Sequence, residues 1–255
     1  MEIKFVGIVL SNIDYREKDK LVNIFSVSDG LVLGKLKSVK GASSKLKVLA
    51  SPFCLAEFTA VKAKDKMTIT GGEVIDTFFD ITSDIEKYFV GCCILDFERK
   101  LIANDNELEK HFKLLVSVLK SLSYSEENAK LVLIKYLLEV LSISGFALNF
   151  ECCSACKNKL NENAFIDIID GSIKCGNCVG QKYITVSREE KEFLNQVSNK
   201  NHSIKLNYNN EKLNAILKLL GNYVYCQFDY ILKLEEILKF WYWFFSFNHS
   251  CLLFI

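Results

Sequence analysis

The stretch LVNIFSVSDGLVLGKLKSV, residues 21–39, indicates the fold of the N-terminal part of the chain. Its first half is rich in β-branched and aromatic residues, which favour a strand over residues 21–27. The dipeptide Asp29-Gly30 is typical of a tight hairpin turn, and residues 31–39 supply the returning strand. The sequence therefore predicts a β-hairpin at this point.

Further short strands flank this hairpin on both sides. Apolar and polar residues alternate over residues 3–5, and an apolar run follows to residue 10. Residues 57–61 and 67–75 are also strand-like. Gly71-Gly72 indicates a bulge or tight bend in the last of them. Five short strands within about 80 residues fit a small barrel, and the five-stranded OB-fold is the obvious candidate. A small open sheet is nearly as compatible with the pattern.

The composition excludes several classes of protein. Apolar residues make up 50% and charged residues 25% of the 255 residues, so the chain is neither disordered nor collagen-like. The net charge of +1 does not announce a nucleic-acid partner, and any basic surface must be local. Arg16, Arg99 and Arg188 are the only arginines among 32 basic residues. Sequence-specific base reading, which relies on the Arg fork, is therefore not expected to dominate.

The ten cysteines favour a reducing compartment. Several lie inside apolar runs, as Cys54, Cys92 and Cys93 do. The apolar stretch at residues 5–10 is too short and too poorly flanked for an export signal. We therefore expect a cytoplasmic protein whose paired cysteines bind metal.

The strongest motif consists of two Cys-x-x-Cys pairs, Cys153 with Cys156 and Cys175 with Cys178, separated by eighteen residues. Two residues between paired cysteines let a tight turn present both sulfurs to one ion, which suits a tetrahedral Zn²⁺ site. Four thiolates close the coordination shell, so we expect one structural zinc ion. Disulfides or plain thiols are the alternative. Cys152 could replace Cys153, but it would leave a three-residue gap to Cys156 and is interpreted as a bystander.

Apolar residues repeat at helical spacing beyond about residue 80. Three Ser-x-x-Glu sequences have the spacing of a capping box and predict helix starts: Ser83 with Glu86, Ser123 with Glu126, and Ser187 with Glu190. Further helices are predicted over residues 108–122, 210–220 and 230–239. Gly145 is expected to end the helix that starts at Ser123.

The predicted fold class is α+β, with an N-terminal five-stranded OB-fold barrel and then a helical domain with an inserted four-cysteine zinc module. The expected segments are 1–80 for the OB-fold barrel, 81–150 and 186–240 for the helical domain, 151–185 for the zinc module, and 241–255 for a hydrophobic tail of unknown role. The last 16 residues hold 12 apolar side chains and no Asp, Glu, Lys or Arg. Because a spanning helix needs about 20 such residues, a packed helix end is expected, with a tail that touches a partner or a membrane as the alternative.

A weaker signal is a segment without acidic residues, 30–56, where the chain average of 31 in 255 predicts about three. Its five lysines, together with Arg16, are candidate DNA contacts: Lys35, Lys37, Lys40, Lys45 and Lys47. Lysines on a loop of small residues suit contact with phosphates without sequence choice. A solvated loop between strands is the alternative.

Four aromatic residues of the expected N-terminal barrel, residues 1–80, could stack on bases, namely Tyr15, Phe25, Phe53 and Phe58. Each is more often a core residue. Tyr15 is the best candidate for stacking because charged residues follow it directly.

Enzyme motifs are absent from the sequence. There is no phosphate loop followed by Lys-Ser/Thr, and no Gly-x-Ser-x-Gly, His-Glu-x-x-His or Lys-x-Asp-Gly. Asp14, Glu17 and Asp19 alternate with basic residues, which suits a salt-bridged turn better than a metal site. We therefore expect no enzymatic activity.

Several further sequences occur in an order typical of one family. They are Gly7 to Leu10, Asp14 to Val22, Phe25, Gly30, Lys40 to Lys45, Pro52 to Phe58, Gly145 to Phe150, and Gly171 before the second cysteine pair. In this order, over residues 1 to about 235, the chain resembles the bacterial RecO family of recombination mediator and DNA repair proteins.

The resemblance implies an OB-fold, a helical domain and a zinc module. It also implies binding of single-stranded and double-stranded DNA, and annealing of complementary strands. The implied partners are a RecR-type mediator protein and the single-stranded DNA-binding protein, through which the RecA recombinase is loaded, and no membrane is expected. The chain departs from the family pattern in two places. Lysines replace the usual arginines of the basic loop, and the stretch from Trp241 is apolar instead of polar.

The hypothesis is therefore a non-enzymatic mediator that anneals DNA strands. The alternative is a zinc-containing protein–protein adaptor without direct DNA binding. A zinc-ribbon nuclease comes third, because the sequence lacks a carboxylate cluster with plausible two-metal spacing.

Overall fold

The computed structural model describes residues 2–39, 41, 46–63, 66–103, 107–198 and 208–238. Contacts within the chain divide it into two compact units, residues 1–127 and 128–255. The predicted hydrophobic tail, 241–255, lies outside the described residues, so its role stays a prediction.

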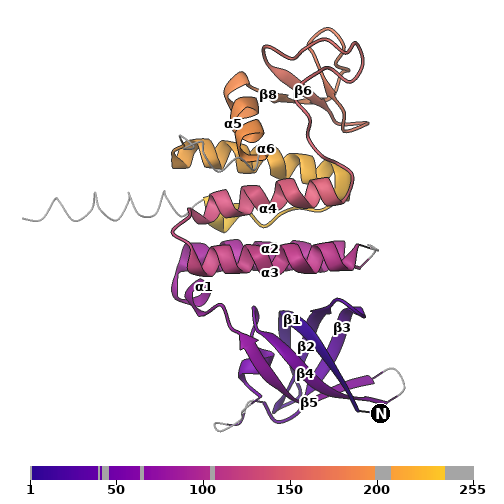
Figure 1. Ribbon diagram of the computed structural model, residues 1–255, viewed down its shortest axis with the longest axis vertical. Coiled ribbons are helices and arrows are strands. Elements are labelled where there is room, and N and C mark those ends of the chain that lie inside the picture. Colours follow the sequence, from indigo (N-terminus) through magenta and orange to yellow (C-terminus); the bar gives the residue numbers. More distant parts are fainter. Residues whose placement is uncertain are drawn as a thin grey trace, which may run out of the picture. The chain divides into compact units, whose positions relative to one another are not determined.

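The N-terminal strands form a closed five-stranded barrel (Figure 1). The strands are β1 (Glu2–Tyr15), β2 (Asp19–Ser26), β3 (Gly30–Leu36), β4 (Leu55–Ala63) and β5 (Lys66–Asp76). They neighbour one another in the order β1-β2-β3-β5-β4, and β4 pairs with β1. The pairing of β3 with β5 is parallel and the other pairings are antiparallel. This topology confirms the predicted OB-type barrel, with the hairpin at Asp29-Gly30, and excludes the open sheet.

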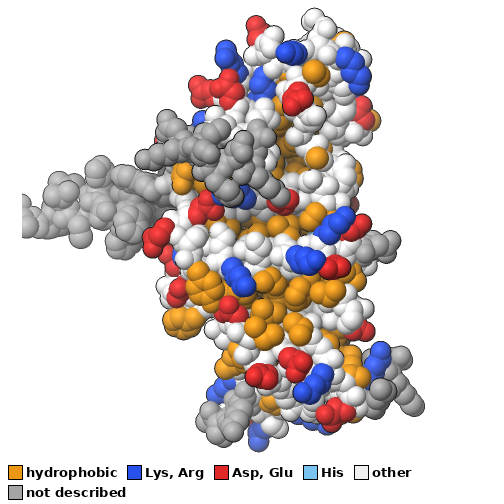
Figure 2. All heavy atoms as spheres, viewed as in Figure 1, with side chains coloured by type: hydrophobic (Ala, Val, Ile, Leu, Met, Phe, Trp, Pro, Cys, Tyr) orange, Lys and Arg blue, Asp and Glu red, His pale blue; other side chains and the backbone are white. Residues whose placement is uncertain are grey.

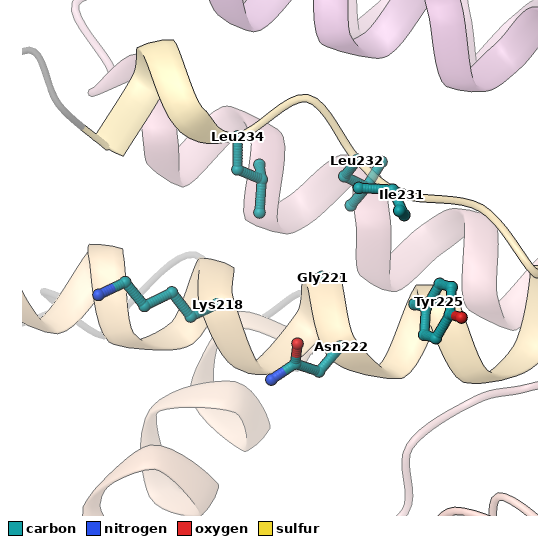
Figure 3. Close-up of a pocket in the computed structure, with 7 residues that line it drawn as sticks. All are labelled: Lys218, Gly221, Asn222, Tyr225, Ile231, Leu232 and Leu234. Carbon is teal, nitrogen blue, oxygen red and sulfur yellow. The ribbon is translucent and has the colours of Figure 1, made fainter.

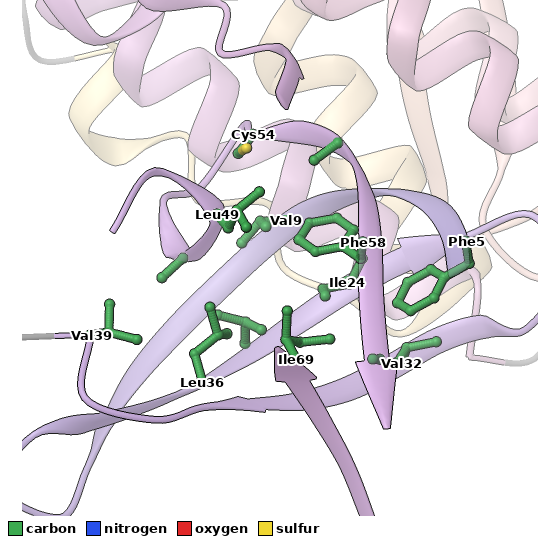
Figure 4. Close-up of a cluster of buried hydrophobic side chains, with 14 residues drawn as sticks. Phe5, Val9, Ile24, Val32, Leu36, Val39, Leu49, Cys54, Phe58 and Ile69 are labelled. Atoms are coloured by element: carbon green, nitrogen blue, oxygen red, sulfur yellow. The ribbon is translucent and has the colours of Figure 1, made fainter. Parts of the chain in front are cut away.

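The barrel interior is filled by apolar side chains from alternate positions of the strands. In β3, Val32 and Leu36 are buried, whereas Leu31 and Leu33, on either side of Val32, are exposed. Figure 4 shows the buried cluster, in which Phe5 and Phe58 stack with ring centroids 5.6 Å apart. Other members are Val9, Ile24, Val39, Leu49, Cys54 and Ile69.

The predicted irregularity at Gly71-Gly72 is confirmed. The register of β4 and β5 shifts between Thr59 and Ala60, opposite Gly71. A Cβ atom on Gly72 would lie 2.8 Å from the carbonyl oxygen of Glu57. Glycine is therefore required here because two backbones approach closely.

Three helices complete the first unit: α1 (Phe79–Ser83), α2 (Ile85–Leu101) and α3 (Leu108–Tyr124). The predicted helix start at Ser83 with Glu86 is wrong. Asp84 caps α2, since its carboxylate accepts a hydrogen bond of 2.9 Å from the N–H of Lys87. Ser83 instead ends α1, where its hydroxyl donates to the carbonyl oxygen of Asp80. The helix predicted over residues 108–122 is confirmed as α3.

Aromatic contacts join the barrel to these helices. Phe25 of β2 lies edge-on to Phe112 of α3, with ring centroids 5.4 Å apart. Phe53 lies edge-on to Tyr88 of α2 at 6.1 Å. Gly91 of α2 allows this approach, because a Cβ there would lie 2.7 Å from the Phe53 ring. Phe25 and Phe53 are fully buried and serve the packing of the unit.

The second unit contains helices and a small sheet (Figure 1). The helices are α4 (Ala129–Ile143), α5 (Arg188–Ser198) and α6 (Asn210–Phe228). The antiparallel sheet has the order β7-β6-β8, with β6 (Ala164–Asp167), β7 (Ile173–Lys174) and β8 (Tyr183–Val186).

The predicted helix start at Ser123 with Glu126 is wrong. Ser123 lies in the last turn of α3, and Asn128 caps α4 by accepting a hydrogen bond from the N–H of Lys130 at 2.9 Å. Gly145 follows the end of α4 with φ of 82°, as expected for a glycine that ends a helix.

The capping box at Ser187 is confirmed. The N–H of Glu190 donates to the Ser187 hydroxyl, and the Glu190 carboxylate accepts from the N–H of Ser187 at 2.8 Å. These reciprocal bonds fix the start of α5 directly after β8.

Helix α6 is longer than predicted, and the helix predicted over residues 230–239 is wrong. Asp229, in the left-handed conformation with φ of 48°, ends α6. Residues 230–234 are not helical, and residues 235–238 form one helical turn. Within the described ranges, none of the helices combines the length and the apolar character that crossing a bilayer requires.

A buried hydrogen-bonded pair of side chains joins α2 to α3. Glu98 Oε1 lies 2.8 Å from His111 Nδ1, and both side chains are 0% exposed. A carboxylate withdrawn from water in this way needs such a partner, because desolvation is otherwise costly.

Replacement of Glu98 by Ala should destabilise the chain by about 3–5 kcal/mol, because it removes one partner of a buried pair. Glu109→Ala is the control, since Glu109 forms a pair with Lys113 whose side chains are 69% and 73% exposed. The control should stay within measurement error of the wild type. Urea unfolding, followed by circular dichroism, gives the free energy of unfolding of both variants. Equally small decreases in this free energy would contradict the assigned role of the buried pair.

Candidate nucleic-acid interface and metal centre

Tyr15, Arg16 and Lys35 come together where β1 turns into β2. Lys35 Nζ lies 5.0 Å and Arg16 Cζ lies 5.4 Å from the centroid of the Tyr15 ring. The tyrosine is 36% exposed, so its aromatic surface is partly open to solvent. In OB-folds the turn between strands 1 and 2 and the face of strands 2 and 3 commonly bind oligonucleotides. Two of the predicted contact residues therefore share one site with the aromatic residue that the sequence favoured for stacking.

Asp19 lies inside this cluster. Its carboxylate binds Lys35 Nζ at 2.8 Å and accepts a hydrogen bond of 3.0 Å from the N–H of Ser38. The Lys35 ammonium, and next the Ser38 amide, lower the pKa of Asp19 below its usual value. Lys20 lies 3.9 Å from Asp14 in the same turn, which confirms the salt-bridged turn that the sequence predicts.

The role of Asp19 beside Lys35 was not predicted from the sequence, although the hairpin contains the signal. The antiparallel register set by Asp29-Gly30 pairs Lys20 with Leu36. Asp19 therefore falls beside the end of β3, within reach of Lys35 and the residues that follow it.

The remaining predicted lysines are not all described. Lys37 is exposed just beyond β3, and Lys47 is exposed at the start of the 3-10 helix η1 (Val48–Ala50). Lys40 and Lys45 lie outside the described residues. Acidic and basic side chains of the described residues are interspersed on the face seen in Figure 2, so this face shows no extended patch of one sign.

Phe25, Phe53 and Phe58 cannot act as stacking platforms, because each is 0% exposed. Phe58 belongs to the barrel core, and the other two pack on the helices of the same unit. Tyr15 is the one of the four predicted aromatic residues that is accessible.

The four cysteines of the two Cys-x-x-Cys pairs converge in the second unit. The Sγ atoms of Cys153, Cys156, Cys175 and Cys178 all lie within 4.8 Å of one another. Cys156 Sγ and Cys175 Sγ are 3.8 Å apart. A tetrahedral ion with metal–sulfur bonds of about 2.3 Å needs sulfurs separated by about 3.8 Å, so the geometry suits a metal ion.

The electrostatics of the cluster also suit a cation. Burial raises the pKa of the Cys153 thiol, but backbone N–H groups, those of Cys156 and Cys175 foremost, lower it more, to about 6. The neighbouring sulfurs of Cys175 and Cys156 raise the pKa of Cys178 to about 12. The raised pKa of Cys178 indicates that a neighbouring sulfur opposes its ionisation, an effect that a bound cation would offset.

The rest of the module fixes the turns that carry the cysteines. Lys174 of β7 binds both Asp167 and Asp170 at 2.9 Å, which ties the β6–β7 turn together. The buried ammonium of Lys191 on α5 donates to the carbonyl oxygens of Leu160 and Glu162. These bonds attach the module to α5, so the cysteine cluster is held from outside as well as by its own turns.

A shallow hollow of about 470 Å³ lies between α6 and the segment after it (Figure 3). Its walls are Lys218, Gly221, Asn222 and Tyr225 of α6, together with Ile231, Leu232 and Leu234. These seven residues include no carboxylate, histidine or cysteine.

Family models match almost all of the chain described above. "Recombination protein O N terminal" matches residues 1–78, and "Recombination protein O C terminal" matches residues 82–233. The chain belongs to the RecO family. The resemblance inferred from the sequence is thereby confirmed.

Relatives named DNA repair protein RecO span most of the chain. The RecO of Clostridium novyi is 26% identical over 232 residues, 87% of each chain. That of Caldicellulosiruptor saccharolyticus is 22% identical over 240 residues, 93% of this chain and 98% of the relative. That of Clostridium acetobutylicum is 24% identical over 238 residues, which are 91% of this chain and 96% of the relative.

In this chain, Cys175→Ser should weaken metal binding strongly, because it removes one of the four thiolates of the tetrahedral set. Cys152→Ser, which removes the exposed neighbour of Cys153, should keep about one ion per chain. Elemental analysis of the purified proteins measures both. Loss of metal in Cys152→Ser together with its retention in Cys153→Ser would identify Cys152 as the ligand instead.

Proposed function

We propose that this chain is a recombination mediator that binds single-stranded and double-stranded DNA, anneals complementary strands and helps partner proteins to load a recombinase. Membership of the RecO family supports this proposal. The observation that carries the DNA-binding part is the exposed Tyr15 ring between Arg16 and Lys35, at the edge of an OB-type barrel.

The proposed mechanism is electrostatic. Cations from the β1–β2 turn, from β3 and from the segment after it would neutralise phosphates of two strands at once: Arg16, Lys35, Lys37, Lys40, Lys45 and Lys47. Weaker repulsion between the strands lets complementary bases search for each other and pair. No bond is made or broken in this mechanism, and no nucleotide is hydrolysed.

The metal of the four-cysteine cluster is proposed to be one structural Zn²⁺. Soft thiolate ligands in a tetrahedral set favour this ion. When bound, it would cross-link the turn at Cys153 to the turn at Cys175 and so hold a small module that buries few apolar residues of its own.

The proposal extends to partners, location and domains. The partners would be a RecR-type mediator protein and the single-stranded DNA-binding protein, acting in the cytoplasm on nucleoid DNA. Residues 1–80 would bind DNA, residues 81–150 and 186–240 would form the helical domain, and residues 151–185 the zinc module.

The first test is a titration of fluorescent single-stranded DNA across a salt series, with a complementary strand added at each step. With four phosphate contacts, a rise from about 50 to about 200 mM salt should lower the affinity about fiftyfold. Annealing should be faster than without protein. Absence of binding even at low salt would contradict the proposal and favour a protein–protein adaptor.

Lys→Glu changes at positions 37, 45 and 47 together should weaken DNA binding at least tenfold and lower the slope of log K against log salt by about two. The reason is the loss of three phosphate contacts. The matched control carries the same charge change on exposed lysines of α3: Lys110, Lys113 and Lys120. Fluorescence anisotropy measures binding, and thermal unfolding should be similar for both variants. Equal weakening in the control would assign the effect to net charge alone.

Tyr15→Leu should weaken single-strand binding by about fivefold or more, because stacking on a base is lost. Duplex binding should change less, since paired bases are already stacked on each other. Tyr15→Phe keeps the ring and should restore single-strand binding. Tyr225→Leu, at another exposed tyrosine, is the control. Equal losses for single and double strands would argue against stacking.

A further inference from the structure

Asp19 is an acidic group inside a site that is proposed to bind phosphates. Its side chain is 16% exposed, and that of Lys35 is 23% exposed, so the pair is largely shielded from water. Electrostatics alone would make a carboxylate here unfavourable for DNA binding. If Asp19 favours DNA binding, it must contribute something that outweighs its repulsion of the phosphates.

The first contribution concerns Lys35. A lysine side chain has four rotatable bonds and loses much conformational freedom when it binds a ligand. The contact with Asp19 at 2.8 Å fixes the ammonium, which then lies 5.0 Å from the Tyr15 ring centroid. Since an ammonium has three N–H donors, a contact with Asp19 leaves capacity for a phosphate oxygen.

The second contribution concerns the backbone. Ser38 has φ of 55°, in the left-handed region that non-glycine residues rarely adopt. Asp19 accepts a hydrogen bond from the N–H of this residue. The bond stabilises the backbone where the chain leaves β3 and enters the lysine segment, which we define as residues 37–47. Lys37 immediately precedes Ser38 in this segment.

We propose that Asp19 is a positioning residue of the DNA site: it holds Lys35 beside the ring of Tyr15 and anchors the backbone at Ser38, where the lysine segment begins. The inference rests on the proposed DNA binding and adds to it. A negative residue thereby promotes the binding of a polyanion, because it orders the cations more than it repels the phosphates.

The test uses Asp19→Asn in the full chain, with short single-stranded DNA as the probe. This change raises the local charge by one unit, so electrostatics alone predicts tighter binding. The positioning role predicts the opposite, namely weaker binding by about three- to tenfold, with a salt slope lower by about one. Asp29→Asn, at an exposed position of the β2–β3 turn, makes the same charge change elsewhere and should not weaken binding.

A double-mutant cycle separates positioning from a general effect on folding. If Asp19 acts through Lys35, Asp19→Asn should have little further effect once Lys35→Ala is present. Asp19→Glu retains the charge and should recover part of the affinity. If Asp19→Asn is too unstable to measure, the cycle is run with Asp19→Glu in its place, and additive losses of affinity from Asp19→Glu and Lys35→Ala would overturn the proposal.

The outcomes distinguish this inference from the proposed function. Wild-type protein that does not bind DNA at low salt overturns both. Wild-type protein that binds, together with Asp19→Asn that binds as tightly as Asp29→Asn, overturns the positioning role alone. Additive losses of DNA affinity in the cycle also overturn the positioning role, because they would show that Asp19 does not act through Lys35.

Discussion

Closure of the barrel through β3 and β5 is the constraint on which the candidate DNA site depends. Three residue pairs join these strands in parallel: Gly34 with Met67, Lys35 with Thr68, and Leu36 with Ile69. A Cβ atom on Gly34 would lie 2.9 Å from the Ile69 side chain, so glycine allows the strands to meet. Because Lys35 also pairs with Leu21 of β2, its backbone is held from both sides. Its ammonium can therefore be placed beside Tyr15 by the fold itself.

Much of the first unit was predictable because the signals are local. The turn at Asp29-Gly30 fixes the register of a hairpin, and alternation of apolar residues fixes which face is buried. Boundaries were less predictable because neighbouring residues compete. Residues 11–15 lack an apolar run, yet β1 continues through them since each pairs with β2. Ser83 and Asp84 are both good caps, and the backbone geometry selects Asp84.

The two candidate sites also differ in how far the sequence alone predicts them. The cysteine cluster follows from spacing alone, because each pair sits on one tight turn and the sheet between them returns the chain. The environment of Lys35 does not follow from residue spacing, because it includes Asp19 from a different strand. Charge composition identifies a basic segment, but only the paired strands show that one of its lysines already has an acidic neighbour.

The contacts of Phe25 with Phe112 and of Phe53 with Tyr88 have a consequence for cooperativity. The boundary between the two family models falls between residues 78 and 82, yet the compact unit continues to residue 127. A fragment cut at that boundary would expose two large aromatic rings that are buried in the intact chain. We therefore expect the barrel and helices α1 to α3 to unfold together, so that stability lost in a helix is also lost by the strands.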